Sequence, residues 1–376
     1  MNDPLGALPA GLDVAPEEAR PSVTLEAAAS APAATRAGSP PGVRLAVLGA
    51  SGYAGQELIR LAFAHPRLTV AWLGSREHAG ASAEVALPGL DPRAVSLPSL
   101  REPLDLEHAL DTDAVDVVIA CLPHGAWRSL AAEHRALGEK PRRVVDLSSD
   151  HRTGEAGYVY GLPEGFRASL AGATRIANPG CYPTAFTLAL LPAAEAGWLD
   201  GPVAVSAVSG VSGAGRAPQL GTSLVERSSS AAIYRAGGDH PHVAEMERTL
   251  ARLGAALPVG FVPHLAPMSR GILLSASAPL ARSVEPDEAR GAYRRRYAEE
   301  PFVRVLEGDV WPDTRAVSHS NRCDVAVTTL HGGRTLLATT ALDNLVKGAA
   351  GQAIQNLNIA LGWPEATGLP AHGIPW

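Results

Sequence analysis

A short apolar run that leads into a glycine-rich turn constrains the fold of this 376-residue chain more than any other feature. Val43–Leu48 has the composition of a buried parallel strand, and a helical pattern resumes after the turn. Glycines in such a turn allow a tight bend and a close backbone approach to a pyrophosphate on the helix N-terminus. The spacing is G-x-x-G-x-x-G, and a turn that serves packing alone is the alternative. We therefore expect a dinucleotide to contact Gly49, Ser51, Gly52, Tyr53, Ala54 and Gly55.

The end of the next strand-like run indicates which dinucleotide is bound. NAD sites place an acidic residue there, which binds the ribose 2′-hydroxyl. This chain instead has Ser75-Arg76, directly after the run Val70–Leu73 and Gly74. A hydroxyl and a guanidinium suit a 2′-phosphate, which a carboxylate would repel. The sequence therefore predicts NADP(H) with Ser75 and Arg76 as contacts, unless Arg76 is only a solvated loop residue.

Alternating strand-like and helical stretches predict the fold class. Apolar runs at Val115–Leu122 and Val144–Leu147 imply crossover helices and a doubly wound, Rossmann-like NADP-binding α/β domain over residues 43–177. Longer strand-like runs follow, so residues 178–343 are expected to form a second, α+β domain on a mostly antiparallel sheet, for catalysis and oligomerisation. Asn344–Leu361 is expected to be one long helix, within a segment 344–376 that completes the first domain. The runs of the second half are Val203–Ser209, Val259–His264, Gly271–Ala278, Cys323–Thr329 and Arg334–Leu342.

Composition limits the class of protein. Lys and Arg number 32 against 38 Asp and Glu, which gives a net charge of −6. The chain therefore lacks the excess of positive charge that is typical of a nucleic-acid-binding protein. No apolar run approaches the roughly 20 residues of a membrane helix, and three cysteines cannot form a disulfide framework. We expect a globular cytoplasmic protein without nucleic-acid or membrane partners. Residues 1–42 hold 11 Ala, 7 Pro, 4 Gly and no aromatic residue, which predicts a disordered tail.

The segment Asn178–Thr184, which reads Asn-Pro-Gly-Cys-Tyr-Pro-Thr, carries the most informative chemistry. Asn-Pro-Gly predicts a turn, and the following residues predict a helix through Ala185–Ala196. Cys181 would then lie at a helix N-terminus, where the macrodipole and free amides favour the thiolate. Such a thiolate is a nucleophile, and the same amides can hold an oxyanion. The alternative, a cysteine buried as a small apolar residue, suits Cys121 and Cys323 better.

A nucleophile of this kind needs an acid–base partner, and His240-Pro-His242 is the distinctive candidate among 12 histidines. The pair follows a Gly-rich loop and opens a helical pattern, Val243–Leu250. One of the two imidazoles could exchange a proton with a thiohemiacetal oxygen. A zinc site on both histidines, Asp239 and a Cys is a competing hypothesis, but no Cys or second acidic cluster lies at ligand spacing, so we expect no metal. A helix-capping or core His pair is the other alternative.

Together these segments make residues 43–370 similar to the N-acetyl-γ-glutamyl-phosphate reductases, a family of acyl-phosphate reductases of arginine synthesis related to aspartate-semialdehyde dehydrogenase. The cysteine segment and the C-terminal segment are long and specific. The motifs that carry the resemblance are Gly49-Ala-Ser-Gly-Tyr-Ala-Gly55, Val145-Asp-Leu-Ser-Ser-Asp-His-Arg152, Asn178-Pro-Gly-Cys-Tyr-Pro-Thr184, Ser209-Gly-Val-Ser-Gly-Ala-Gly-Arg216, Pro263-His264, Pro267-Met-Ser-Arg-Gly-Ile272 and Asp343-Asn-Leu-Val-Lys-Gly-Ala-Ala-Gly-Gln352.

The resemblance implies a covalent mechanism for a small acyl-phosphate substrate. The Cys181 thiolate attacks the acyl phosphate and releases phosphate, NADPH reduces the thioester, and the thiohemiacetal collapses to N-acetylglutamate semialdehyde. His240 is the implied acid–base group, with His242 as the alternative or as a substrate contact. Arg216 and Arg270 are the implied cationic contacts of phosphate or carboxylate. The resemblance places Asn344 near the nicotinamide, and it implies a homodimer or homotetramer.

The chain departs from the family's sequence pattern in its histidine segment, and related enzymes offer alternative functions. The family's His segment reads Gly-His-Arg-His, whereas Asp239 and Pro241 stand here, so the choice between His240 and His242 is open. The related lysine-synthesis reductase, which acts on carrier-bound aminoadipyl phosphate, has a cysteine turn resembling Ala-Gly-Cys-Asn and lacks the Ser209–Arg216 stretch. Aspartate-semialdehyde dehydrogenase resembles the chain less well around Cys181. A non-catalytic NADP-binding sensor would have lost the nucleophile or the histidine.

Overall fold

The computed structural model describes residues 42–90, 97–216, 220–236 and 240–374. The predicted disordered tail, residues 1–42, lies outside the described residues except for Gly42. The described part of the chain contains two seven-stranded sheets, one formed by β1–β7 and the other by β8–β14. The boundary predicted near residue 177 remains a prediction, although the last strand of the first sheet ends at Ala177.

The first sheet has the strand order β3-β2-β1-β4-β5-β7-β6, and every neighbouring pair is parallel. The predicted doubly wound sheet is therefore confirmed. The order reverses between β1 and β4, and ligands of such sheets bind in the crevice at the carboxyl ends of the strands there. The strands are β1 Val43–Leu48, β2 Leu68–Gly74, β3 Leu100–Arg101, β4 Val117–Ala120, β5 Arg143–Asp146, β6 Val159–Tyr160 and β7 Arg175–Ala177.

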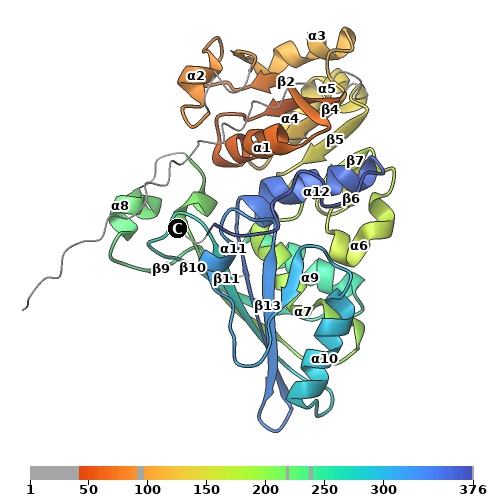
Figure 1. Ribbon diagram of the computed structural model, residues 1–376, viewed down its shortest axis with the longest axis vertical. Coiled ribbons are helices and arrows are strands. Elements are labelled where there is room, and N and C mark those ends of the chain that lie inside the picture. Colours follow the sequence, from red (N-terminus) through yellow and green to blue (C-terminus); the bar gives the residue numbers. More distant parts are fainter. Residues whose placement is uncertain (1–41, 91–96, 217–219, 237–239, 375–376) are drawn as a thin grey trace, which may run out of the picture. The chain divides into compact units, whose positions relative to one another are not determined.

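Helices cover both faces of this sheet because side chains alternate along its apolar strands. On β1, Leu45 and Val47 pack in one core with α1 and α12, whereas Ala46 and Leu48 pack in another with α3, α4 and α5 (Figure 1). The helices of this region are α1 Tyr53–Ala64, α2 Ala83–Ala86, α3 Leu106–Asp111, α4 Ala126–Glu133, α5 Arg135–Glu139 and α6 Pro163–Leu170, with 3-10 turns at Pro103–Asp105 and Glu155–Gly157.

The second sheet has the order β12-β13-β14-β11-β8-β10-β9. It is mostly antiparallel, as predicted, but β10 lies parallel to β8 and β12 lies parallel to β13. The strands are β8 Val203–Ser209, β9 Ala232–Ile233, β10 Val259–Leu265, β11 Ile272–Pro279, β12 Val303–Val305, β13 Cys323–Leu330 and β14 Thr335–Leu342.

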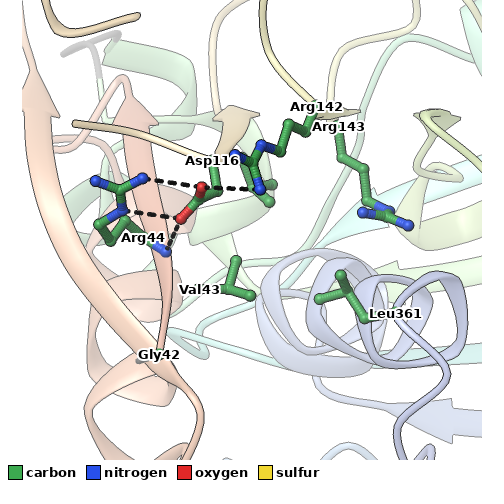
Figure 2. Close-up of a pocket in the computed structure, with 8 residues that line it drawn as sticks. Gly42, Val43, Arg44, Asp116, Arg142, Arg143 and Leu361 are labelled. Atoms are coloured by element: carbon green, nitrogen blue, oxygen red, sulfur yellow. Dashed lines mark hydrogen bonds and ion pairs between the residues drawn. The ribbon is translucent and has the colours of Figure 1, made fainter. Parts of the chain in front are cut away.

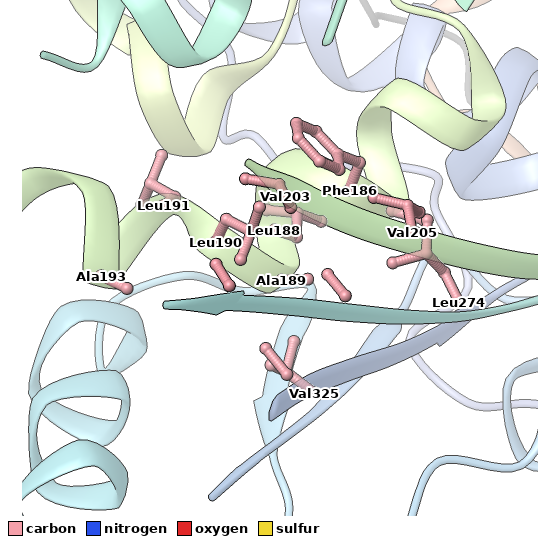
Figure 3. Close-up of a cluster of buried hydrophobic side chains, with 14 of the residues drawn as sticks. Phe186, Leu188, Ala189, Leu190, Leu191, Ala193, Val203, Val205, Leu274 and Val325 are labelled. Atoms are coloured by element: carbon pink, nitrogen blue, oxygen red, sulfur yellow. The ribbon is translucent and has the colours of Figure 1, made fainter. Parts of the chain in front are cut away.

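One face of the second sheet packs on α7 (Cys181–Glu195), an almost fully buried helix. Figure 3 shows Phe186 and Leu190 of α7 among the core side chains Val203, Val205 and Leu274 of the sheet. Burial alternates along β8, β10 and β11, so their other face carries exposed positions. The remaining elements are α8 Leu224–Arg227, α9 Pro241–Arg252, α10 Pro286–Tyr297 and α11 Thr314–Val317, with 3-10 turns at Val211–Ala214 and Leu220–Thr222.

The C-terminal segment differs from the single long helix predicted over Asn344–Leu361. A π-helical turn occupies Val346–Ala350, and α12 follows over Gly351–Ala360. The start of α12 packs closely on its surroundings, since an added Cβ on Gly351 would lie 2.4 Å from the Asn321 side chain. The helix does not extend through residues 361–374. Apolar side chains of α12 share a buried core with the first sheet, and the completion of that domain by residues 344–376 stays a prediction.

Candidate functional site

The glycine turn after β1 forms a backbone cradle at the carboxyl edge of the first sheet. Gly49 has a φ of +76°, and an added Cβ there would lie 2.3 Å from the Cys121 carbonyl oxygen. An added Cβ on Gly55 would lie 2.3 Å from the Gly49 oxygen. Gly52 is the N-cap of α1, so Tyr53 and Ala54 open the helix and Tyr53 is exposed. A pyrophosphate fits such a cradle, because free amides at a helix N-terminus bind anions.

Ser51 and Ser75 connect the cradle to the end of β2. Their hydroxyls lie 3.0 Å apart and both residues are buried, while the amide of His78 donates to the Ser75 hydroxyl at 3.3 Å. Arg76 follows directly and its side chain is exposed at the mouth of this turn. A solvent-facing guanidinium beside a buried hydroxyl suits the predicted 2′-phosphate contact.

Cys181 is the first residue of α7, with Gly180 as N-cap, so the predicted helix N-terminus is confirmed. The turn before it is bound on several sides. The side chain of Asn178 donates from Nδ2 to the Ala349 carbonyl oxygen at 3.1 Å, and its Oδ1 accepts from Asn356 at 3.0 Å. The Gly180 amide donates to Glu245 Oε1 at 2.9 Å.

The surroundings of Cys181 work against the predicted resting thiolate. Burial raises the pKa of Cys181 to about 11, although the positive charge of Arg152 and the first amides of α7 act in the opposite direction. The helix terminus therefore does not compensate for lost solvation. A nearby base must take the thiol proton before the sulfur can act as a nucleophile.

Both predicted histidines lie beside the cysteine turn. Their ring centroids are 4.9 Å apart, and the Tyr182 ring meets His240 at 6.2 Å and His242 at 5.8 Å. His240 is the N-cap of α9, and its Nδ1 accepts the amide of His242 at 3.2 Å. An added Cβ on Gly180 would lie 2.6 Å from His242 Nε2, so this ring faces the residue before Cys181.

Burial keeps both imidazoles neutral near pH 7. It lowers the pKa of His240 to about 4, with smaller contributions from the charges of Arg235 and His124. Burial also lowers the pKa of His242 well below its usual value, followed by the charge of Arg152. Neutral imidazoles can accept a proton from a thiol. The capping alternative for His240 is also realised, since the ring caps α9 and faces the site at once.

Arg152 and Glu245 are site residues that were not predicted as such. Arg152 Nη1 donates to Glu245 Oε2 at 2.9 Å, and both side chains are 6% exposed. Arg152 also donates to the carbonyls of Asn178 and Leu147, and Tyr160 donates to Glu245 Oε1 at 2.8 Å. For Arg152 the sequence carried two signals: it ends the motif Val145–Arg152 that contributes to the family resemblance, and this motif follows a parallel strand at its carboxyl end.

The polar segment from Asp146 to Arg152 is held together by its own hydrogen bonds and by bonds to α4. Asp146, the last residue of β5, accepts from the Ser148 hydroxyl at 2.9 Å and pairs with His151 Nδ1 at 2.8 Å. Asp150 accepts from the amides of Gly125 and Arg128 at the start of α4. Burial disfavours the charged form of Asp150, but these hydrogen bonds outweigh it and hold its pKa below the usual range.

The two predicted substrate arginines have protein partners. Arg216 is exposed, and its Nη1 donates to the Ser51 carbonyl oxygen at 2.5 Å, which brings it to the glycine cradle. Arg270 donates to Glu57 at 2.8 Å and lies 3.6 Å from an Asp343 carboxylate oxygen. Arg270 thus faces two carboxylates, one of which also pairs with Arg60, and its contact with a phosphate stays a prediction. An exposed cation that was not predicted, Arg235, lies near enough to the histidines to lower their pKa values.

Asn344 precedes the π-helical turn rather than opening a helix. Its Oδ1 accepts from the Gly271 amide at 2.8 Å and its Nδ2 donates to the Ser212 hydroxyl at 3.0 Å. It therefore joins the segment after β8 to the segment before β11. Whether it also contacts a nicotinamide stays a prediction.

Two other features of the described residues lie outside this site. Glu164, Glu300 and Glu365 place carboxylate oxygens within 4.8 Å of one another, but Lys347 and Arg167 lie among them and balance their charge. Asp239 of the competing zinc hypothesis lies outside the described residues. A pocket at the opposite, amino-terminal edge of the first sheet contains the Arg44–Asp116 ion pair (Figure 2).

Comparisons with known proteins agree with this geometry. Residues 44–173 match the family model "Semialdehyde dehydrogenase, NAD binding domain", and residues 181–344 match "Semialdehyde dehydrogenase, dimerisation domain". Solved structures share the fold. Aspartate semialdehyde dehydrogenase II from Vibrio cholerae, complexed with ASA, has a TM-score of 0.69 at 15% identity, covering 86% of this chain and 99% of that one. The enzyme from Candida albicans, solved with NADP, has a TM-score of 0.63 at 17% identity, covering 85% and 98%.

Fold and site together define an oxidoreductase of the semialdehyde-dehydrogenase type that binds a nicotinamide dinucleotide. The relatives refine this class. N-acetyl-gamma-glutamyl-phosphate reductase from Thermus thermophilus is 44% identical over 362 residues, which cover 88% of this chain and 99% of the relative. The same-named protein from Streptomyces clavuligerus is 43% identical over 351 residues, covering 88% and 99%. The chain belongs to the N-acetyl-gamma-glutamyl-phosphate reductase family. Among the described residues, no helix is both long and apolar enough to cross a membrane.

Proposed function

We propose that this protein reduces N-acetyl-γ-glutamyl phosphate to N-acetylglutamate semialdehyde and phosphate with NADPH, as a step of arginine biosynthesis. Family membership supports the substrate. The observation that carries the chemistry is the position of Cys181, at the first residue of α7 and beside two imidazoles that burial keeps neutral. A thiol, a proton acceptor and helix-terminal amides are the groups that acyl transfer to sulfur requires.

Cys181 acts as the nucleophile in this proposal. Its proton passes to an imidazole, its sulfur bonds to the acyl carbon, and the bond from that carbon to the phosphate oxygen breaks, which yields a thioester and phosphate. We assign the proton transfer to His240 and keep His242 as the alternative or as a substrate contact. Because His240 Nδ1 accepts a backbone amide, the neutral ring carries its proton on Nε2. In this tautomer Nε2 can donate a proton to the thiohemiacetal oxygen, whereas accepting the thiol proton requires His240 to release that amide bond or His242 to act instead.

The cofactor site uses the cradle and the end of β2. Gly49, Gly52 and Gly55 would hold the pyrophosphate, and Ser75 and Arg76 would hold the 2′-phosphate that distinguishes NADPH from NADH. When bound, the nicotinamide supplies a hydride to the acyl carbon. The protein's remaining task is to protonate and release the sulfur of Cys181 as the thiohemiacetal collapses to the aldehyde.

Self-association through the second sheet is part of the proposal, as a homodimer or homotetramer. The second half of the chain matches a dimerisation-domain model. The face of the sheet away from α7 carries exposed apolar residues, such as Val262 on β10 and Leu273 on β11. A second copy that covers this face would bury them. All three cysteines are free, which suits the reducing cytoplasm in which we place the enzyme.

Phosphate-dependent oxidation of N-acetylglutamate semialdehyde, followed by the absorbance of reduced nicotinamide, tests the function. We expect turnover with this substrate and none with Cys181→Ser, which should still bind NADPH. Turnover only with a carrier-bound aminoadipyl substrate would favour the lysine-synthesis reductase. NADPH binding without turnover of either substrate would favour a non-catalytic sensor.

A further inference from the structure

A fully buried ion pair lies behind the cysteine turn. The side chains of Lys347 and Glu164 are both 0% exposed, and Lys347 Nζ donates to Glu164 Oε1 at 2.7 Å and to Gln355 Oε1 at 2.8 Å. Burial alone would raise the pKa of Glu164, but attraction to Lys347 and the hydrogen bonds hold it below its usual value. The bond from Lys347 to the Glu164 carboxylate joins the π-helical turn to α6.

Such a pair is a poor source of stability. Removing two charges from water is costly, and apolar replacements of similar volume are often as stable as the buried pair. The ion pair does, however, specify geometry, because Nζ must lie within hydrogen-bond reach of an oxygen on another element. Lys347 lies within the π-helical turn Val346–Ala350, whose irregular backbone helix propensity does not explain.

The two residues after Lys347 contact the cysteine turn through their backbone. An added Cβ on Gly348 would lie 2.8 Å from Cys181 Cβ, so the backbone at Gly348 lies directly against the nucleophile. The Ala349 carbonyl accepts the side-chain amide of Asn178 at 3.1 Å. A shift of this turn would therefore change both the packing around Cys181 and the hydrogen bonds of the residues before it.

We propose that Lys347 is a positioning residue for the nucleophile: its buried bond to Glu164 fixes the π-helical turn whose Gly348 and Ala349 backbone holds the Asn178–Cys181 segment in place. The inference rests on the proposed role of Cys181. Lys347 does not contact the sulfur in this arrangement and acts only through the turn.

The double variant Lys347→Met/Glu164→Gln tests it, because it removes both charges and nearly conserves volume. We expect a folded protein whose turnover falls about tenfold to a hundredfold, since a displacement of about 1 Å can cost that much. KM for NADPH should be unchanged. Iodoacetamide should alkylate Cys181 faster than in the wild type at pH 8, because a displaced turn exposes the thiol to water. Faster alkylation with slower turnover separates lost positioning from a general loss of folded protein.

Matched variants keep the inference falsifiable. Arg44→Met/Asp116→Asn breaks the ion pair of Figure 2 at the far edge of the first sheet and should alter neither readout. If the double variant does not fold, Glu164→Gln alone keeps an acceptor for Nζ and should show the same signature more weakly. If the folded double variant shows wild-type turnover and wild-type alkylation while Cys181→Ser is inactive, the proposed role of Lys347 is overturned and that of Cys181 stands. Normal turnover of Cys181→Ser would instead overturn the nucleophile and the inference with it.

Discussion

Glu245 Oε1 accepts the amide hydrogen of Gly180 at 2.9 Å, and this bond joins the two halves of the catalytic constellation. Glu245 lies on α9, the helix that His240 caps, and Gly180 caps the helix that Cys181 opens. One carboxylate thereby links the proposed acid–base histidines to the proposed nucleophile. The same negative charge contributes to the raised pKa of Cys181, while Arg152 opposes it.

The substitution Glu245→Gln should separate these two effects. The amide oxygen can still accept the Gly180 hydrogen bond, but the negative charge is lost, so the pKa of Cys181 should fall. Iodoacetamide labelling followed against pH should then show its midpoint at lower pH than in the wild type, with a several-fold faster reaction at pH 8. Glu245→Ala, which also removes the hydrogen bond, serves as the comparison for turnover. An unchanged labelling profile in Glu245→Gln would contradict the electrostatic role.

Cofactor choice should depend on Arg76. We expect the wild-type enzyme to prefer NADPH over NADH in kcat/KM, and Arg76→Glu to reduce that preference about tenfold or more, because a charged hydrogen bond contributes about 1.5–3 kcal/mol. Steady-state kinetics with both cofactors measure it. Arg67→Glu, a change of the same charge before β2, is the control. Equal efficiency of the two cofactors with the wild-type enzyme would refute the prediction.

The cradle offers a matched pair of glycine substitutions. Gly55→Ala places a Cβ 2.3 Å from a backbone oxygen, whereas Gly52→Ala places one 3.3 Å from the same Gly49 oxygen. We expect Gly55→Ala to weaken NADPH binding strongly or to destabilise the fold by about 1–3 kcal/mol, and Gly52→Ala to have a much smaller effect. Fluorescence titration with NADPH and thermal melting distinguish these outcomes. Equal behaviour of both variants would show that the tight contact is not what the turn requires.

Stability should fall with acidity below neutral pH because of the histidine pair. The pKa of His240 is lowered to about 4 in the folded protein, against an ordinary value of about 6.5 in the unfolded chain. The unfolded state therefore binds more protons between these values, and the free energy of unfolding rises with pH across that window. Its contribution is complete above about pH 6.5 and is lost as the pH falls toward 4. His240→Asn should flatten this part of the profile, measured by denaturant unfolding at several pH values.

Local patterns predicted the parts of the protein that local chemistry determines. β1 and β8 have the predicted bounds, and Cys181 opens its helix because Asn-Pro-Gly and Pro183 favour that start. What the sequence did not predict are properties that distant residues impose. Desolvation in the folded protein opposes the Cys181 thiolate, and Arg270 donates to Glu57, which is 213 residues away in sequence. The hydrophobic periodicity of a sequence does not reveal contacts between residues that are this far apart in the chain.

Selective labelling provides the most direct test of the nucleophile. The three cysteines differ in access and pKa: burial raises the pKa of Cys181 to about 11 and that of Cys121 to about 12, and it raises the pKa of the fully buried Cys323 as well. A resting thiolate would react rapidly near pH 7, but a thiol with these properties should react slowly there and faster as the pH rises.

Limiting iodoacetamide at pH 8 to 9 should therefore modify Cys181 before the other two cysteines, with loss of activity proportional to modification of that site in peptide mass mapping. Acyl phosphate should protect it, because the sulfur is then held in the thioester. Rapid labelling of Cys181 at pH 7 would support a resting thiolate after all. Activity that survives complete modification of Cys181 would exclude this residue as the nucleophile.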